Sequence, residues 1–118
     1  MEAYPIFIWT WGNKRRRAPP HPVQHNFNVC NVTAGYKPHG VDLRKVDGRD
    51  KRLQAKVERG RNFDLYMKAV ISKVQNEGVT KIGINCHKGR HRSVAFAELA
   101  KAELQRLGYT VVLEHVEI

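Results

Sequence analysis

Cysteine, long apolar runs and acidic residues are all scarce in this chain. It has only two cysteines, Cys30 and Cys86, whereas small secreted domains usually carry more, in a disulfide framework. Their separation also argues against a structural zinc site, which needs closely spaced ligands, and we expect neither a metal nor a cofactor. No run of about 18 apolar residues is present, so the sequence predicts no membrane-spanning helix.

The shortage of acids leaves a strongly basic chain. Lys plus Arg total 21 against 11 for Asp plus Glu, which gives a formal net charge of +10. Such a balance indicates a polyanionic partner, with nucleic acid first, although a charge that serves only solubility would have the same composition. The residues from Met1 to Trp9 lack the basic region and cleavage site of a secretory signal, so we expect a cytoplasmic protein.

Hydrophobic residues make up 42% of the 118 positions, enough for one core in a single domain over residues 1–118. Short apolar runs predict strands, and longer segments with apolar residues at helical spacing predict helices. The two kinds alternate in the second half, which is typical of a parallel sheet. We predict an α/β domain with a mostly parallel sheet and flanking helices. Strands are expected near 6–9, 26–32, 81–86 and 110–118, and helices near 50–58, 63–77 (between Asn62 and Gly78) and 93–107.

Two segments are predicted to be exposed loops. Four adjacent cations precede three prolines, which fix φ and remove backbone donors, and the stretch from Thr33 to Gly48 is rich in Gly, Pro and His. Clustered cations favour RNA binding, and Trp9, Trp11 and Tyr36 are candidates to stack on bases. The ordinary interpretation of the two tryptophans is that they belong to the core. The cations predicted to contact RNA are Lys14, Arg15, Arg16 and Arg17.

The chemistry is concentrated where the strand ending at Cys86 leads into the helix that begins near Arg92. Backbone N–H groups at a helix start are unpaired, and the helix dipole there favours an anion. Gly89 would let the backbone come close to a ligand, and five of the six residues 87–92 are basic or histidine. Each alone has an ordinary interpretation as a turn residue, solvated cation or buried thiol, but together they predict a phosphate site. Its members are Cys86, His87, Lys88, Gly89, Arg90, His91, Arg92 and Ser93.

The run from Asn85 to Val94, followed by Ala97-Glu98, resembles the phosphate-loop segment of the C-terminal domain of the RapZ family of RNase adapter proteins. In that family a strand leads into Gly-Cys-Thr-Gly-Gly-Lys/Gln-His-Arg-Ser-Val and then a helix. The likeness covers most of the chain, in the family's order. The supporting matches are Trp11-Gly12-Asn13-Lys14, Lys37-Pro38-His39, Leu43-Arg44 and Gly48-Arg49-Asp50.

This resemblance implies a fold similar to a phosphosugar-binding subdomain, binding of an amino-sugar phosphate and of regulatory RNA, and self-association. It implies a phosphate on the loop from Cys86 to Ser93, with Lys14 and Arg44 as secondary ligand contacts. We therefore expect a regulatory domain for a ligand of the phosphosugar or nucleotide class, with RNA and a second copy as partners. The family's basic tail is replaced by Glu114 to Ile118, and no Walker A loop occurs, so neither RNA binding by the tail nor ATP hydrolysis is implied.

A second, shorter resemblance leaves an enzyme open as the alternative. The spacing Cys86-x-x-Gly89-x-x-Arg92-Ser93 is similar to the loop of cysteine-dependent phosphatases. In such an enzyme Cys86 would attack phosphorus, Arg92 would hold the oxygens, and Asp47 or Asp50 would act as the acid. A third class is a protein-interaction module that keeps the loop without using it.

Overall fold

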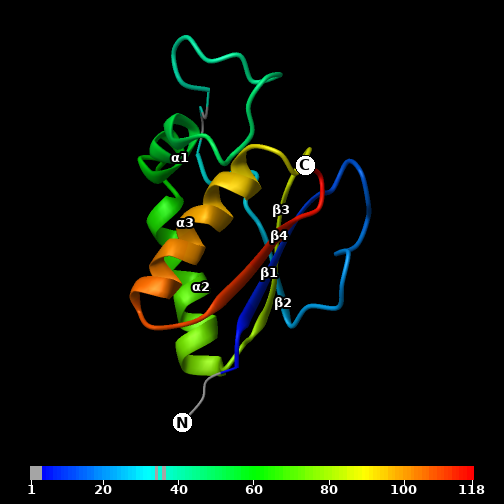
Figure 1. Cartoon of the computed structure of the whole chain (residues 1–118), viewed down its shortest axis with the longest axis vertical. Helices are drawn as coiled ribbons and strands as arrows, with labels where there is room; N and C mark the ends of the chain where they lie inside the picture. Colours follow the sequence, from blue (N-terminus) through cyan, green and yellow to red (C-terminus); the bar gives the residue numbers. More distant parts are fainter. Residues whose placement is uncertain (1–3, 34, 36) are drawn as a thin grey trace.

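The computed structural model describes residues 4–33, 35 and 37–118, and it contains every strand and helix that the sequence predicts (Figure 1). Tyr36, a predicted base-stacking residue, lies outside the described residues. The elements in chain order are β1 (Ile6–Gly12), β2 (His25–Asn28), α1 (Lys51–Glu58), α2 (Phe63–Glu77), β3 (Lys81–Cys86), α3 (Arg92–Arg106) and β4 (Val111–His115).

The four strands form one sheet in the order β2-β3-β1-β4, and every neighbouring pair is parallel. The α/β fold with a parallel sheet is therefore confirmed. Because all strands run the same way, their carboxyl ends meet at one edge of the sheet, where α/β proteins bind ligands. Gly12 lies opposite Cys86 in the register, so the loops that follow the two central strands begin side by side.

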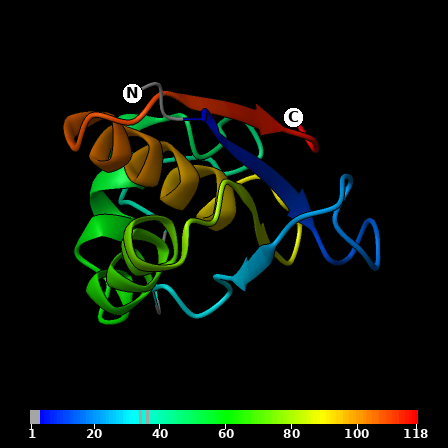
Figure 2. The same cartoon turned by 90° about the horizontal axis from the view of Figure 1, so that it is seen from below.

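The helices all pack on one face of the sheet (Figure 2), and the core lies between these two layers. Alternate strand residues such as Ile8, Ile82 and Ile84 point into it and are fully buried, together with Phe96 of α3. A strand with one buried face shows this period of two. The helix layer therefore covers one face of the sheet and leaves the other face to the loop between β1 and β2.

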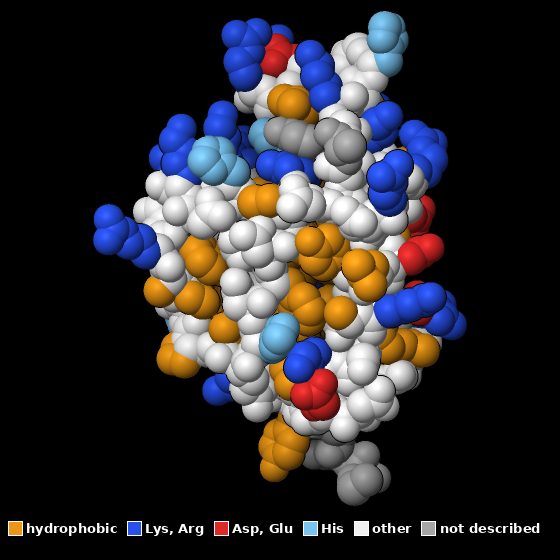
Figure 3. Space-filling view, turned by 180° about the vertical axis from the view of Figure 1, so that it is seen from behind, with side chains coloured by type: hydrophobic (Ala, Val, Ile, Leu, Met, Phe, Trp, Pro, Cys, Tyr) orange, Lys and Arg blue, Asp and Glu red, His pale blue; other side chains and the backbone are white. Residues whose placement is uncertain are grey.

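The uncovered face carries the aromatic residues of β1. Seen from behind (Figure 3), with the β2 edge of the sheet toward the viewer, hydrophobic side chains gather in the middle of the molecule, and Lys and Arg side chains gather above them. Trp9 is half-buried, with its ring centroid 5.9 Å from Phe7 and 4.9 Å from His21. Trp11 is buried, and its indole N–H donates to Asn26 Oδ1 at 3.2 Å. Trp11 therefore has the ordinary role of a core residue, and only Trp9 has a partly accessible ring.

Local details differ from the expectation: β1 extends to Gly12 rather than ending at Trp9, and β4 ends at His115 rather than Ile118. The second strand ends at Asn28 rather than Val32, because the Asn28 side chain accepts a hydrogen bond from the Cys30 N–H at 3.0 Å and turns the chain away. Asn62 precedes α2 as predicted but does not cap it; its amide donates to the Asn31 carbonyl at 2.6 Å. The predicted stop at Gly78 is confirmed by its left-handed φ of 67°.

No helix in the described ranges is both long enough and apolar enough to cross a membrane. Cys30 and Cys86 are free thiols, and Cys86 is buried.

Candidate functional site

The loop from Cys86 to Ser93 is held by backbone hydrogen bonds from both sides. After β1, the Asn13 N–H donates to the Cys86 carbonyl at 3.0 Å, and the Lys14 N–H donates to the His87 carbonyl at 2.9 Å. From the segment before α1, the Gly48 N–H donates to the Arg90 carbonyl at 2.7 Å. Three stretches of chain that are distant in sequence are thus fixed relative to one another.

Glycines make these close approaches possible. Gly89 has a φ of 74°, and a Cβ there would lie 2.5 Å from the Gly12 nitrogen. A Cβ on Gly12 would in turn lie 2.4 Å from the Lys88 carbonyl carbon. Gly48 makes a similar contact with the start of α3, since its Cβ would lie 2.2 Å from the Ala95 nitrogen. The missing side chain of Gly89 therefore lets the loop pack on the end of β1.

His91 joins the loop to the long segment before α1. Its Nε2 lies 2.9 Å from the Leu43 carbonyl oxygen and 3.1 Å from that of Val46. A carbonyl only accepts, so these contacts require a proton on Nε2. His91 is also the N-cap residue of α3, yet its side chain makes no capping bond. The ring is therefore used to anchor a neighbouring loop, and the first amides of α3 are left to other acceptors.

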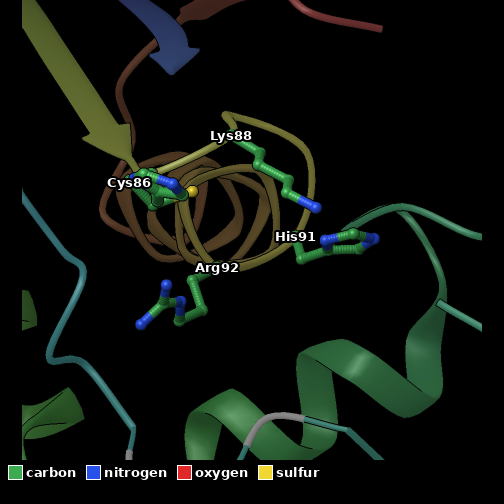
Figure 4. Close-up of a pocket in the computed structure, with 5 residues that line it drawn as sticks. Cys86, Lys88, His91 and Arg92 are labelled. Atoms are coloured by element: carbon green, nitrogen blue, oxygen red, sulfur yellow. The ribbon is translucent and has the colours of Figure 1, made fainter. Parts of the chain in front are cut away.

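A small pocket of about 50 Å³ opens at the carboxyl end of β3 (Figure 4). Lys88 extends toward His91 in this view, whereas Arg92 extends away from both toward the segment after β2. There the guanidinium group donates to the Cys30 carbonyl. Arg92 is thus held in a defined position at the pocket. The side chains that line it belong to Cys86, His87, Lys88, His91 and Arg92.

Cys86 lines this pocket, and its side chain contacts Ser93, which lies behind the lining. The Cys86 Sγ lies 3.2 Å from the Ser93 Oγ, and both side chains are buried. Ser93 and Gly89 do not line the pocket. Of the eight predicted phosphate-loop residues, five therefore face the pocket, while Ser93 and Gly89 support it and Arg90 lies beside it.

A second hollow of about 300 Å³ adjoins the first and shares Lys88 and His91 with it. We call it the basic groove. It contains both predicted secondary ligand contacts, Lys14 and Arg44, from segments distant in the sequence. The residues lining the basic groove are Lys14, Arg15, Leu43, Arg44, Lys88, Arg90 and His91.

The four cations predicted to contact RNA are divided by the structure. Lys14 and Arg15 line the basic groove and are exposed. The Arg16 Nε lies 3.5 Å from a carboxylate oxygen of Glu117, whose same oxygen accepts from the Gly12 N–H at 3.1 Å. Arg17 is exposed and outside the groove lining. Two of the four cations thus face the same space as the phosphate loop.

The two carboxyl groups predicted as acids are both bound to neighbouring arginines. Asp50 caps α1 by accepting from the Arg52 N–H at 2.8 Å, and its carboxylate pairs with the Arg52 guanidinium at 2.7 Å. The hydrogen bonds from Arg52 lower the pKa of Asp50 to about 2. Asp47 pairs with Arg49 at 2.7 Å, and the hydrogen bond from that side chain lowers the pKa of Asp47. Both groups are held ionised, whereas a general acid must carry a proton.

Sequence reasoning missed three residues that hold the backbone of the site in place: Gly12, Gly48 and Glu117. Gly12 and Gly48 entered only as parts of a resemblance, and Glu117 only as part of an acidic tail. Each acts through a backbone contact with a loop far away in sequence, which leaves no local pattern. Gly12, at the end of β1, was the available signal, because a glycine in a strand often marks a close approach of another backbone.

The chain is similar to known proteins over most of its length. Residues 8–118 match the family model described as the RapZ C-terminal domain. A "Nucleotide-binding protein" of Dinoroseobacter shibae is 36% identical over 100 residues, which cover 76% of this chain and 33% of the relative. Proteins of the same name from Thermosipho africanus and Syntrophomonas wolfei are 34% and 32% identical, over 65% and 64% of this chain. The chain corresponds to 33%, 30% and 29% of the length of these relatives.

Proposed function

Because the chain belongs to the RapZ C-terminal domain family, we propose that it is a regulatory domain that binds a phosphorylated ligand of the phosphosugar or nucleotide class. The observation that carries this proposal is the small pocket at the carboxyl end of β3, with Lys88 and Arg92 in its wall. The pocket has room for one small group, and its cations favour an anion. The phosphate enters this pocket, and the rest of the ligand lies outside it.

The pocket has the three features that phosphate recognition needs. We expect the first turn of α3 to supply backbone donors and the positive end of a helix dipole. Arg92 supplies a planar guanidinium group that is already held by the Cys30 carbonyl, so little side-chain freedom is lost on binding. Lys88 is exposed and supplies a mobile positive charge.

Titration of the isotope-labelled protein with inorganic phosphate, an amino-sugar phosphate and a nucleoside monophosphate tests this proposal. We expect the amide signals of residues 87–93 to shift with at least one of these ligands, and Arg92→Ala to abolish the shift. Lys68→Ala, which removes an exposed cation from α2, is the matched control and leaves binding unchanged. Equal responses of the two variants would refute a site at this loop.

We propose RNA as the macromolecular partner, bound in part by Lys14 and Arg15 in the basic groove. Each phosphate contact releases counterions, so a lost contact lowers the slope of log affinity against log salt by about 0.7 for single strands. Fluorescence anisotropy with a short single-stranded RNA over a range of salt measures this slope. Lys14→Ala reduces it and Lys68→Ala does not; the same slope in both variants excludes this surface.

We extend the proposal to self-association, because β4 is an edge strand of the sheet and edge strands offer backbone groups for pairing with a second copy. Sedimentation velocity at several concentrations tests it. A monomer at all concentrations would exclude this part of the proposal.

A cysteine-dependent phosphatase is the second candidate, favoured by one observation: the Cys86 Sγ lies 3.2 Å from the Ser93 Oγ, a contact that can stabilise a thiolate. The ionised state of Asp47 and Asp50 opposes it. Hydrolysis of an aryl phosphate that disappears in Cys86→Ser would establish the enzyme. Absence of turnover by a protein that still binds phosphate would leave only the binding function.

A further inference from the structure

The basic groove is larger than the small pocket and richer in cations. The small pocket measures about 50 Å³ and the groove about 300 Å³. A single phosphate uses only the first of these spaces. Because the two share Lys88 and His91, a ligand seated in the pocket extends directly into the groove.

The groove concentrates positive charge that the protein itself neutralises only in part. Five of its lining residues are Lys or Arg. Among the described residues, only Arg44 of these five forms an ion pair, with Asp42 at 3.1 Å. The others, Lys14, Arg15, Lys88 and Arg90, have no carboxylate within ion-pair distance in the described part of the chain. Like charges repel when brought together, and an anion in the groove would relieve this repulsion.

The convergence of these cations is built into the backbone. The Lys14 N–H bonds to the His87 carbonyl, and the Gly48 N–H bonds to the Arg90 carbonyl. The His91 ring bonds to the Leu43 carbonyl, next to Arg44. The three segments that contribute cations are thus fixed relative to one another, whereas the long side chains of Lys14, Arg15, Arg44 and Lys88 are exposed and can adjust to a ligand.

We propose that the ligand carries two anionic groups, a terminal phosphate in the small pocket and a second phosphate in the basic groove. This inference rests on the proposed function, since it takes the first phosphate as bound at Arg92. Lys88 lines both spaces and contacts both groups. The ligand class is a small diphosphate or bisphosphate rather than a monophosphate.

The same chemistry is present at the 5′-phosphorylated end of an RNA strand, where a terminal phosphate is followed by a phosphodiester. Because RNA is also proposed to contact Lys14 and Arg15, the two ligands would compete for the groove. We assign the joint space of pocket and groove to the small molecule, because a ligand whose phosphate fills the pocket of about 50 Å³ has the adjoining groove of about 300 Å³ to extend into. That space suits two phosphates and a small connecting group. A strand would have to leave it after its first nucleotide.

Isothermal titration calorimetry at constant ionic strength with inorganic phosphate and pyrophosphate tests the proposal. We expect pyrophosphate to bind at least about tenfold more tightly, as one added charge-assisted contact would give. Methylenebisphosphonate, which cannot be hydrolysed at its bridge, behaves as pyrophosphate does. A 5′-phosphorylated and a 5′-hydroxyl oligoribonucleotide form the RNA arm.

The groove variants separate a second phosphate site from general attraction to a basic protein. Lys14→Ala and Arg15→Ala each weaken pyrophosphate binding about fivefold or more and leave inorganic phosphate within about twofold, since a charged contact is lost only for the longer ligand. Both positions are exposed, and circular dichroism verifies the fold of each variant. Lys68→Ala removes the same charge from α2 and changes neither affinity.

Each outcome is decisive. If inorganic phosphate binds and pyrophosphate binds no better, or if Lys14→Ala weakens both ligands equally, the second phosphate site is refuted and the proposed function stands. If a 5′-phosphate improves RNA binding while pyrophosphate has no advantage, the occupant is an RNA end and the small-molecule assignment is overturned. If neither phosphate nor pyrophosphate binds, the second phosphate site is refuted, and the titrations with the amino-sugar phosphate and the nucleoside monophosphate decide the proposed function.

Discussion

The small pocket and the basic groove share two side chains, yet they are built in opposite ways. The pocket wall is fixed: Arg92 donates to the Cys30 carbonyl, and Cys86 is buried on Ser93. The groove wall is formed by long exposed side chains such as Lys14. A fixed wall selects the shape of a ligand, whereas mobile cations supply attraction that salt can screen. Specificity should therefore depend on the pocket, and the salt dependence of affinity on the groove.

Among the variants that test this contrast between pocket and groove, Gly89→Ala should cause the largest loss of stability. The new Cβ would lie 2.5 Å from the Gly12 nitrogen at a φ of 74°. The left-handed conformation and the overpacking together should lower the free energy of unfolding by about 2–4 kcal/mol. Gly78→Ala is the control, because its φ is also positive, at 67°, but nothing lies within 4 Å of the added Cβ. Urea unfolding should show a clearly smaller loss for the control; equal losses would mean that the contact with Gly12 is unimportant.

The second prediction concerns the fixed cation of the pocket. Arg92→Lys keeps the charge but loses the planar donor pair, so phosphate affinity should fall roughly tenfold. Stability should change much less than in Gly89→Ala. Arg106→Lys, at an exposed arginine paired with Glu103 on α3, should leave phosphate affinity as it is. Titration calorimetry measures the phosphate affinity of both variants. Retention of full affinity by Arg92→Lys would show that charge alone, and not a fixed donor geometry, defines the pocket.

The third prediction concerns the bonds that attach the groove to the pocket. In His91→Ala the Leu43 and Val46 carbonyls lose the Nε2 donor, so the segment between them should open more often. Trypsin, which cuts after Arg44 and Lys45, should then cleave there severalfold faster. His39→Ala removes an exposed histidine from the same segment and should leave the rate unchanged. Equal cleavage of both variants would show that His91 does not anchor this wall of the groove.

The smallest predicted effect is on stability at low pH and comes from Asp50, which lies beside the site. Hydrogen bonds from Arg52 lower the pKa of this carboxyl to about 2 from an ordinary 3.8. Since the folded value is the lower one, Asp50 stabilises the fold above about pH 4 and loses this contribution as the pH falls toward 2. Carbon-detected NMR titration of the Asp50 carboxyl measures its pKa. A value near neutrality would restore Asp50 as a candidate acid and weaken the contrast between a binding pocket and a catalytic one.

The sequence predicted best where periodicity and stop signals agree. β3 was predicted over 81–86 and spans Lys81–Cys86, because an apolar run is followed by a cluster of polar and basic residues. α2 ends at Gly78 for the same kind of reason, a left-handed stop after an apolar face. β2 was predicted too long, because a hydrogen bond from the Cys30 N–H to the Asn28 side chain ends it. Such a side-chain bond competes with strand pairing, and the alternation of polar and apolar residues does not reveal it.

For the candidate site, the sequence identified the loop but not what holds it in place. The charge pattern and the two resemblances located residues 86–93, together with Lys14 and Arg44. They did not reveal that Gly89 packs on Gly12, or that His91 bonds to the Leu43 carbonyl. Contacts with a distant backbone atom depend on the fold as a whole, so no local pattern encodes them.

The contact between Gly12 and Gly89 has a mechanical consequence. With no side chain on either residue, the end of β1 and the phosphate loop touch backbone to backbone, and the Lys14 N–H is bonded to the His87 carbonyl. Movement of one stretch is therefore coupled to movement of the other. A small ligand that moves the loop from Cys86 to Ser93 would therefore also move the segment after β1, including the arginines that follow Lys14.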